Sequence, residues 1–73
     1  MSRRDLIAHL RRHGCEFVRE GGNHSWWQNP ATQRRSTVPR HNEIEDLLAR
    51  KICRDLGIPE PGPGMRRGRR SLR

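Results

Sequence analysis

Turn-forming and helix-stopping residues divide the first 60 residues of this chain into five short segments. Gly14, the run 21–23 and the run 29–33 carry glycine, asparagine or proline, and Pro39 and the run 57–59 interrupt the chain in the same way. Each segment has room for one helix or one strand. The chain therefore has to build a small domain from five short elements, and none approaches the ~18 apolar residues of a membrane span.

The first segment has the pattern of an amphipathic helix. Ser2 followed by Asp5 is a variant capping box, in which the serine hydroxyl accepts from a backbone N–H of the first turn. Gly14 follows where a helix commonly ends. The apolar residues at helical spacing are Leu6, Ile7 and Leu10. The pattern predicts a helix over about 3–13.

The last segment predicts a second helix. Asn42 and Glu45 offer another box-like start, and Gly57, Ile58 and Pro59 are typical of a left-handed cap, a closing apolar contact and a stop. The apolar residues expected on one helix face are Ile44, Leu47, Leu48, Ile52 and Leu56.

Three short runs between the helices favour extended backbone. They cover residues 15–20, 25–27 and 35–38, and Pro39 bars further pairing of the third. Consecutive runs separated by turns predict an antiparallel meander. The fold class is therefore α+β in the order αβββα, with a three-stranded antiparallel sheet, two helices on one face and the other face open.

Trp26 and Trp27 are consecutive, so in a strand they point to opposite faces of the sheet. One should pack beneath the helices, and the other should lie on the open face, where it could stack on a base or be covered by a protein partner. Alternation with His24 predicts that Trp26 shares the face of that histidine, unless the turn shifts the register by one residue. The alternative is a tryptophan that lies across its own strand.

Charge separates the chain into two parts. The 73 residues carry a net charge of +8, of which residues 1–60 contribute +3 and residues 61–73 contribute +5 from five arginines and no acid. The last thirteen residues have almost nothing to bury, so we expect one domain over 1–60 and a disordered basic tail over 61–73. The tail could add affinity for phosphates or could serve solubility alone.

Composition and the positions of the cysteines limit the kinds of protein that this chain can be. The chain has 73 residues, of which 30% are hydrophobic, with no long apolar stretch and no basic-then-apolar leader. We therefore expect neither a membrane protein nor a secreted precursor, nor an enzyme of several domains. Cys15 and Cys53 form no CxxC pair and fall on apolar patterns, which favours buried thiols in a cytoplasmic protein. His9 and His13 have a spacing that could bind a metal, but no third ligand is placed beside them, so we expect no metal site.

Two motifs and the element order together resemble the HicA toxins of bacterial toxin–antitoxin modules. The motifs are Arg-Glu-Gly-Gly-Asn-His at 19–24 and Ser-Thr-Val-Pro-Arg-His at 36–41, and the likeness covers residues 2–59. The resemblance implies a fold like that of double-stranded-RNA-binding domains, cleavage of mRNA by one histidine, and neutralisation by a HicB antitoxin. It implies that His24 is the catalytic residue.

The sequence departs from the commoner family form at a few places. Asn23 and Ser25 stand on either side of His24, where the commoner form has serine before the histidine and often histidine or arginine after it. The Gly-Thr-Leu stretch of the last helix is absent, and residues 49–53 occupy that region.

The residues themselves can support such chemistry. RNA carries its own nucleophile, the 2′-hydroxyl, so a ribonuclease needs to hold a phosphate and move protons, which a histidine with an ordinary pKa of ~6.5 can do near neutral pH without a metal or another cofactor. Arg34, Arg35 and Arg40 lie on or beside the third strand and could hold phosphates. His41 could move a second proton or could orient the entry to the last helix.

The alternatives to a ribonuclease are a non-catalytic RNA-binding module of the same shape and a protein adaptor that acts only within a repressor complex. For His24 itself, the alternative is a turn histidine with local hydrogen bonds. For the three arginines, it is an ordinary solvated surface.

Overall fold

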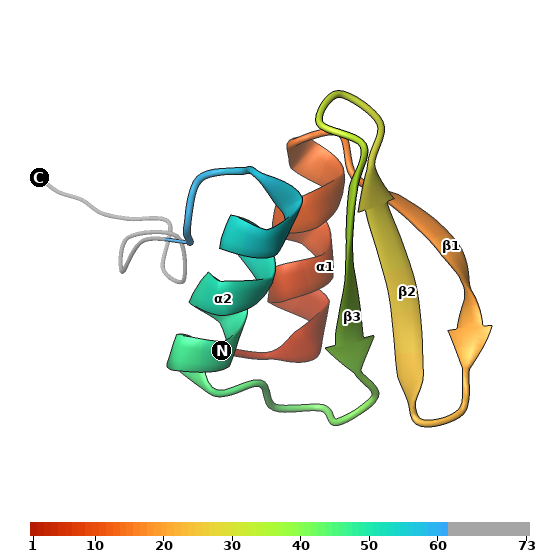
Figure 1. Cartoon of the computed structure of the whole chain (residues 1–73). Coiled ribbons are helices and arrows are strands. Elements are labelled where there is room, and N and C mark those ends of the chain that lie inside the picture. Colours follow the sequence, from red (N-terminus) through yellow and green to blue (C-terminus); the bar gives the residue numbers. More distant parts are fainter. Residues whose placement is uncertain (62–73) are drawn as a thin grey trace, which may run out of the picture.

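The computed structural model describes residues 1–61 and confirms the αβββα order. Figure 1 shows both helices on the same side of a three-stranded sheet. The elements are α1 (Arg3–Arg12), β1 (Glu16–Gly21), β2 (His24–Asn29), β3 (Arg34–Pro39) and α2 (Asp46–Leu56). The predicted disordered tail lies, apart from Pro61, outside the described residues. Within residues 1–61, neither helix is long and apolar enough to cross a membrane.

The sheet has the strand order β1-β2-β3, and both pairs are antiparallel as the meander predicts. The pairing of β1 with β2 is irregular at one point. Phe17 lies opposite Trp27 and Arg19 lies opposite Trp26, so Val18 is an extra residue in β1. A β-bulge of this kind leaves one residue unpaired and turns the following side chains to the other face.

The core lies between the helices and one face of β2 and β3. Trp27 is 3% exposed and packs there, and Phe17 meets its ring edge-on with a centroid distance of 5.9 Å. Phe17 is itself 48% exposed, and no residue of β1 is buried. The helices therefore cover β2 and β3 and leave β1 outside the core. The other buried apolar residues are Met1, Leu6, Leu10, Cys15, Val38, Ile44, Ala49, Ile52, Cys53, Leu56 and Ile58.

The start of α1 follows the sequence prediction. The Ser2 hydroxyl accepts a hydrogen bond of 3.0 Å from the backbone N–H of Asp5, which satisfies one of the free donors of the first turn. The helix ends at Arg12, and the backbone N–H of Cys15 then donates to the Leu10 carbonyl at 2.9 Å. This contact closes the helix before β1 begins.

The start of α2 differs from the prediction. Asn42 does not cap the helix, which begins at Asp46 after the N-cap residue Glu45, and Glu45 makes no capping bond through its side chain. The preceding residues are extended because they pair with the start of the chain, and the backbone N–H of Ile44 donates to the Met1 carbonyl at 2.8 Å. This pairing between distant segments removes one turn from the predicted helix.

The buried face of α2 also differs from the prediction, because at 3.6 residues per turn Leu47 lies on the opposite side of the helix from Leu56. Leu47, expected on the buried face, is 73% exposed, whereas the face toward the sheet carries Ala49, Ile52, Cys53 and Leu56. The predicted end of the helix is confirmed. Gly57 has a φ of +73°, and the backbone N–H of Ile58 donates to the Cys53 carbonyl at 3.0 Å.

Both cysteines are free and buried, as the apolar patterns predict. Burial raises the pKa of the Cys15 thiol, and it raises the pKa of the Cys53 thiol to about 11. Near neutral pH neither sulfur is a thiolate, so the two cysteines are core residues and not nucleophiles.

Candidate functional site

His24 is the first residue of β2, directly after the turn that follows β1, and its side chain is exposed. Its cross-strand neighbours are Gly21 on β1 and Pro39 on β3. Figure 1 shows this turn at the same end of the molecule as the connection from β3 to α2 and the starts of both helices. The imidazole therefore stands at the end of the sheet, on the face that the helices do not cover.

Trp26 shares this open face with His24, as alternation along the strand predicts. It is half-buried, and it lies opposite Arg19 on β1 and Thr37 on β3. Its indole leans over β1 toward the turn, because Nε1 lies 3.0 Å from the position that a Cβ on Gly21 would take. The indole thus covers the residue directly opposite His24, and it does not lie across its own strand.

The three arginines proposed to hold phosphates do not come together in the structure. Arg35 lies opposite Gln28 on the open face, two rows of residues from His24. Arg34 lies on the other face, where its Nη1 donates to the Arg54 carbonyl at the end of α2 (3.4 Å). Arg40 follows the end of β3, and its Nη1 is 3.7 Å from the Glu20 carboxylate.

A polar network lies behind His24, on the face of the sheet that carries the helices. Arg3 of α1 donates from Nε to the Pro39 carbonyl and from Nη2 to the Ser25 Oγ, each at 2.9 Å. The Ser25 hydroxyl lies within 3.2 Å of both Glu20 carboxylate oxygens, to one of which it donates. The network ties α1 to Ser25, which follows His24 on β2, and to Pro39, which lies opposite His24 on β3.

Sequence reasoning missed this network. Its members come from α1, β1, β2 and β3, and only the register of the strands brings them together. Ser25 is 1% exposed, so its hydroxyl needs hydrogen-bond partners within the protein. A serine at an inward position of a strand was the one available signal, because a buried hydroxyl requires hydrogen bonds.

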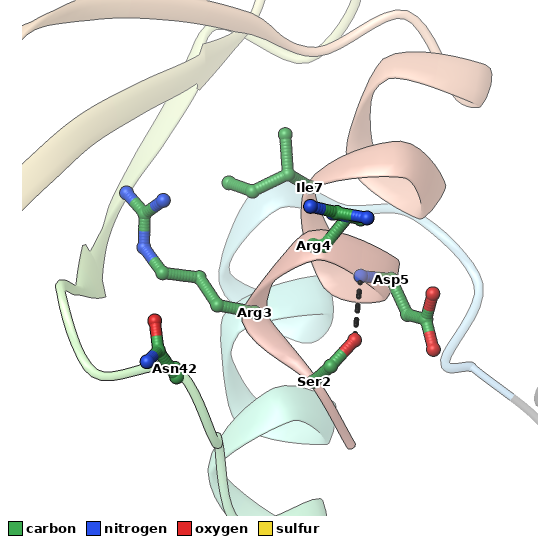
Figure 2. Close-up of a pocket in the computed structure, with 6 residues that line it drawn as sticks. All are labelled: Ser2, Arg3, Arg4, Asp5, Ile7 and Asn42. Carbon is green, nitrogen blue, oxygen red and sulfur yellow. Dashed lines mark hydrogen bonds between the residues drawn. The ribbon is translucent and has the colours of Figure 1, made fainter.

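A shallow hollow lies beside this network, at the start of α1. Figure 2 shows Arg3 reaching from the helix toward the sheet with Asn42 below its side chain, and Arg4 and Ile7 also line the hollow. The remaining lining residues are Ser2 and Asp5, which are joined by the capping bond.

The other histidines lie away from this face or beyond the strands. His9 is buried, with its Nε2 at 2.8 Å from the Pro59 carbonyl, and its ring contacts that of His13. His41 is exposed in the connection between β3 and α2. Among residues 1–61, no three histidine, cysteine or acidic side chains are grouped in a way that could hold a metal ion.

The open face carries three kinds of functional group. His24 offers an exposed imidazole that can exchange protons. Trp26 offers an aromatic surface beside it, and Arg19 and Arg35 offer guanidinium groups that can bind phosphate. A histidine, a stacking surface and cations on one open sheet face could together contact the bases and phosphates of a polynucleotide.

The comparisons with known proteins agree with the fold and the motifs. A family model described as "HicA toxin of bacterial toxin-antitoxin" matches residues 3–58, which include every helix and strand from α1 to α2. No curated protein and no solved structure matches the chain. The match covers well over half of the sequence and includes both motifs on which the resemblance rests. The chain therefore belongs to the HicA toxin family of bacterial toxin–antitoxin modules.

Proposed function

We propose that this toxin is an endoribonuclease that cleaves mRNA in the cytoplasm, with His24 as its catalytic residue. The observation that carries the proposal is the position of His24, exposed at the end of the sheet beside Trp26 on the open face. Membership of the HicA family supports the same activity, because the family's toxins are known as ribonucleases.

The chemistry uses the 2′-hydroxyl of the RNA as the nucleophile. The hydroxyl oxygen forms a bond to the adjacent phosphorus, and the bond from phosphorus to the 5′ oxygen of the next nucleotide breaks. His24 acts as general base, taking the 2′-hydroxyl proton, or as general acid, giving a proton to the departing 5′ oxygen. His41 is the candidate for the second proton transfer. This scheme requires no metal ion and no small-molecule cofactor.

Substrate contacts are proposed for the residues around His24. Trp26 stacks on a base, and Arg35 binds a phosphate two rows away on the same face. Arg40 and Arg34 contact RNA from outside this face. For Arg40 the contact competes with its ion pair to Glu20, whereas Arg34 would have to give up a long hydrogen bond to the end of α2.

The partner that restrains the toxin is a cognate antitoxin, as membership of a toxin–antitoxin family implies. We propose that it resembles HicB and that it neutralises the toxin by covering His24 and Trp26. Burial of a half-exposed tryptophan would favour such a complex. Antitoxin added in increasing amounts should abolish cleavage, and it should shift the fluorescence of wild-type toxin more than that of a Trp26→Phe variant.

One experiment separates the ribonuclease from the two alternatives. The purified chain is incubated with single-stranded RNA in EDTA, and the RNA is analysed for cleavage and for a gel shift. The ribonuclease proposal predicts cleavage of the RNA. A DNA oligonucleotide of the matching sequence, which lacks the 2′-hydroxyl, should resist cleavage. A non-catalytic RNA-binding module would give only a salt-sensitive gel shift. An adaptor would give neither result without its protein partner.

A further inference from the structure

The open face of the sheet is an ordered array of three cross-strand rows. Two residues along a strand advance about 7 Å, so each row lies about that far from the next. The row nearest the β1–β2 turn holds His24, the second row holds Trp26 at its centre, and the third lies at the far end of β2. The rows are Gly21, His24 and Pro39; Arg19, Trp26 and Thr37; and Glu16, Gln28 and Arg35.

The bulge in β1 determines which charged residue stands beside Trp26. Phe17 faces the helices, as its contact with Trp27 demonstrates. In a regular strand Arg19 would face the same way as Phe17, because residues two apart share a face. The extra residue Val18 shifts the alternation by one, so Arg19 lies opposite Trp26 on the open face.

Arg19 is also available to bind a ligand. Within residues 1–61 its side chain makes no ion pair or hydrogen bond, and it is exposed. Arg40, by contrast, is paired with Glu20. The only carboxylate on the open face belongs, among these residues, to Glu16 in the third row. The two rows next to the turn therefore carry positive charge with no acid on the same face.

Trp26 is held in a position that suits stacking. Gly21 has no side chain, so the indole can lean over β1 beside the His24 row without losing its half-exposed surface. A base can stack on an indole only when it is unpaired, because paired bases inside a duplex are stacked on each other. An arginine directly opposite the indole can bind the phosphate that adjoins such a base.

We propose that Arg19 and Trp26 form a subsite for one nucleotide of single-stranded RNA, one row from His24. The base of this nucleotide stacks on Trp26, and its phosphate pairs with Arg19. The subsite rests on the proposed function for the identity of its ligand. In this subsite, Arg19 makes the phosphate contact nearest to His24. Arg35 binds a phosphate farther along the same RNA strand.

The test measures RNA binding without cleavage. Fluorescence anisotropy gives the Kd of a short single-stranded oligonucleotide with 2′-O-methyl riboses, which remove the nucleophile. Trp26→Ala should raise Kd by about 5- to 150-fold, the range for loss of one stacked base. Arg19→Gln should raise Kd and reduce the slope of log K against log salt by about 0.7, which corresponds to one phosphate contact in single-stranded nucleic acid. Gly21→Ala should weaken binding by displacing the indole.

Arg12→Gln is the matched control, because Arg12 is an exposed arginine at the end of α1 and lies outside the open face. It should change Kd much less than Arg19→Gln, and thermal unfolding confirms that each variant is folded. Equal effects of the two arginine variants would overturn the proposal. So would equal binding of a duplex of the same sequence, or a loss of antitoxin binding by Arg19→Gln with RNA binding unchanged.

The outcome is separable from that of the proposed function. If the wild-type chain binds the oligonucleotide through Arg19 and Trp26 but leaves ordinary RNA intact, the subsite stands and the ribonuclease proposal fails. If wild type cleaves RNA and neither Trp26→Ala nor Arg19→Gln changes binding, the ribonuclease stands and the subsite is wrong.

Discussion

The guanidinium of Arg3 donates to the Ser25 hydroxyl at 2.9 Å, which joins the start of α1 to the residue that follows His24. The same side chain donates to the carbonyl of Pro39, the residue opposite His24 on β3. Arg3 thus holds β2 and β3 together at the end of the sheet where His24 lies. A planar group with several donors suits this position, because one lysine amine could not reproduce the geometry of both bonds.

Arg3→Ala should therefore lower stability and activity together. Loss of two hydrogen bonds should reduce the free energy of unfolding by about 1–3 kcal/mol, measured by thermal or urea unfolding. At a temperature where the variant is folded, we expect kcat for RNA cleavage to fall more than KM rises, because the histidine is less well positioned. Arg4→Ala is the control, since Arg4 lines the same hollow without these bonds. Matching losses in both variants would contradict the role of Arg3.

The two tryptophans should respond differently to substitution. Trp27→Ala should cost about 3–5 kcal/mol, because its ring is buried against the helices. Trp27→Phe should cost much less, since the Nε1–H of Trp27 is buried and finds no acceptor among the described residues. Urea unfolding of both variants checks this. Phe costing as much as Ala would mean that the indole nitrogen has a partner.

Gly57 should be the least replaceable glycine in the fold. Its φ is +73°, and an added Cβ would lie 3.0 Å from Cγ2 of Thr32. Gly22 has a similar φ of +65°, but a Cβ there meets nothing within 4 Å. Gly22→Ala should cost roughly 1 kcal/mol from backbone strain alone, and Gly57→Ala should cost more. Since 1 kcal/mol shifts Tm by about 4–8 °C in a domain of this size, calorimetry can resolve the difference.

Alkaline pH should weaken the fold through Cys53. Burial raises the pKa of this thiol from 9.0 to about 11, so between these values the folded state keeps a proton that the unfolded state has lost. Stability is unaffected below pH 9 and falls as pH rises toward 11, by at most about 3 kcal/mol. Urea unfolding at pH 8 and pH 10.5 measures the fall, which should be smaller in Cys53→Ala. An equal fall in that variant would assign the effect to other groups.

The features that sequence reasoning predicted correctly depend on local chemistry. The cap at Ser2, the left-handed end at Gly57 and the opposite faces of Trp26 and Trp27 follow from residue type and from the period of one element. None of them needs information from a distant segment.

The features that it missed depend on contacts between distant segments. Residues before Asp46 are extended because they pair with Met1 and Ser2, and no local signal in Asn42 or Glu45 reveals this pairing. The bulge at Val18 is visible only in the pairing of β1 with β2, and it decides the face of Arg19. For the same reason Arg34 and Arg35 could not be assigned to faces before the register was known.

The catalytic role of His24 is tested by comparing RNA cleavage by wild type, His24→Ala and His13→Ala in EDTA, with equal amounts of folded protein. His13 is an exposed histidine on the helical side, so its substitution controls for loss of an imidazole. Catalysis by His24 predicts that His24→Ala still binds RNA but cleaves it at least 100-fold more slowly, while His13→Ala keeps wild-type activity. A His24→Ala variant that cleaves RNA at the wild-type rate would contradict it.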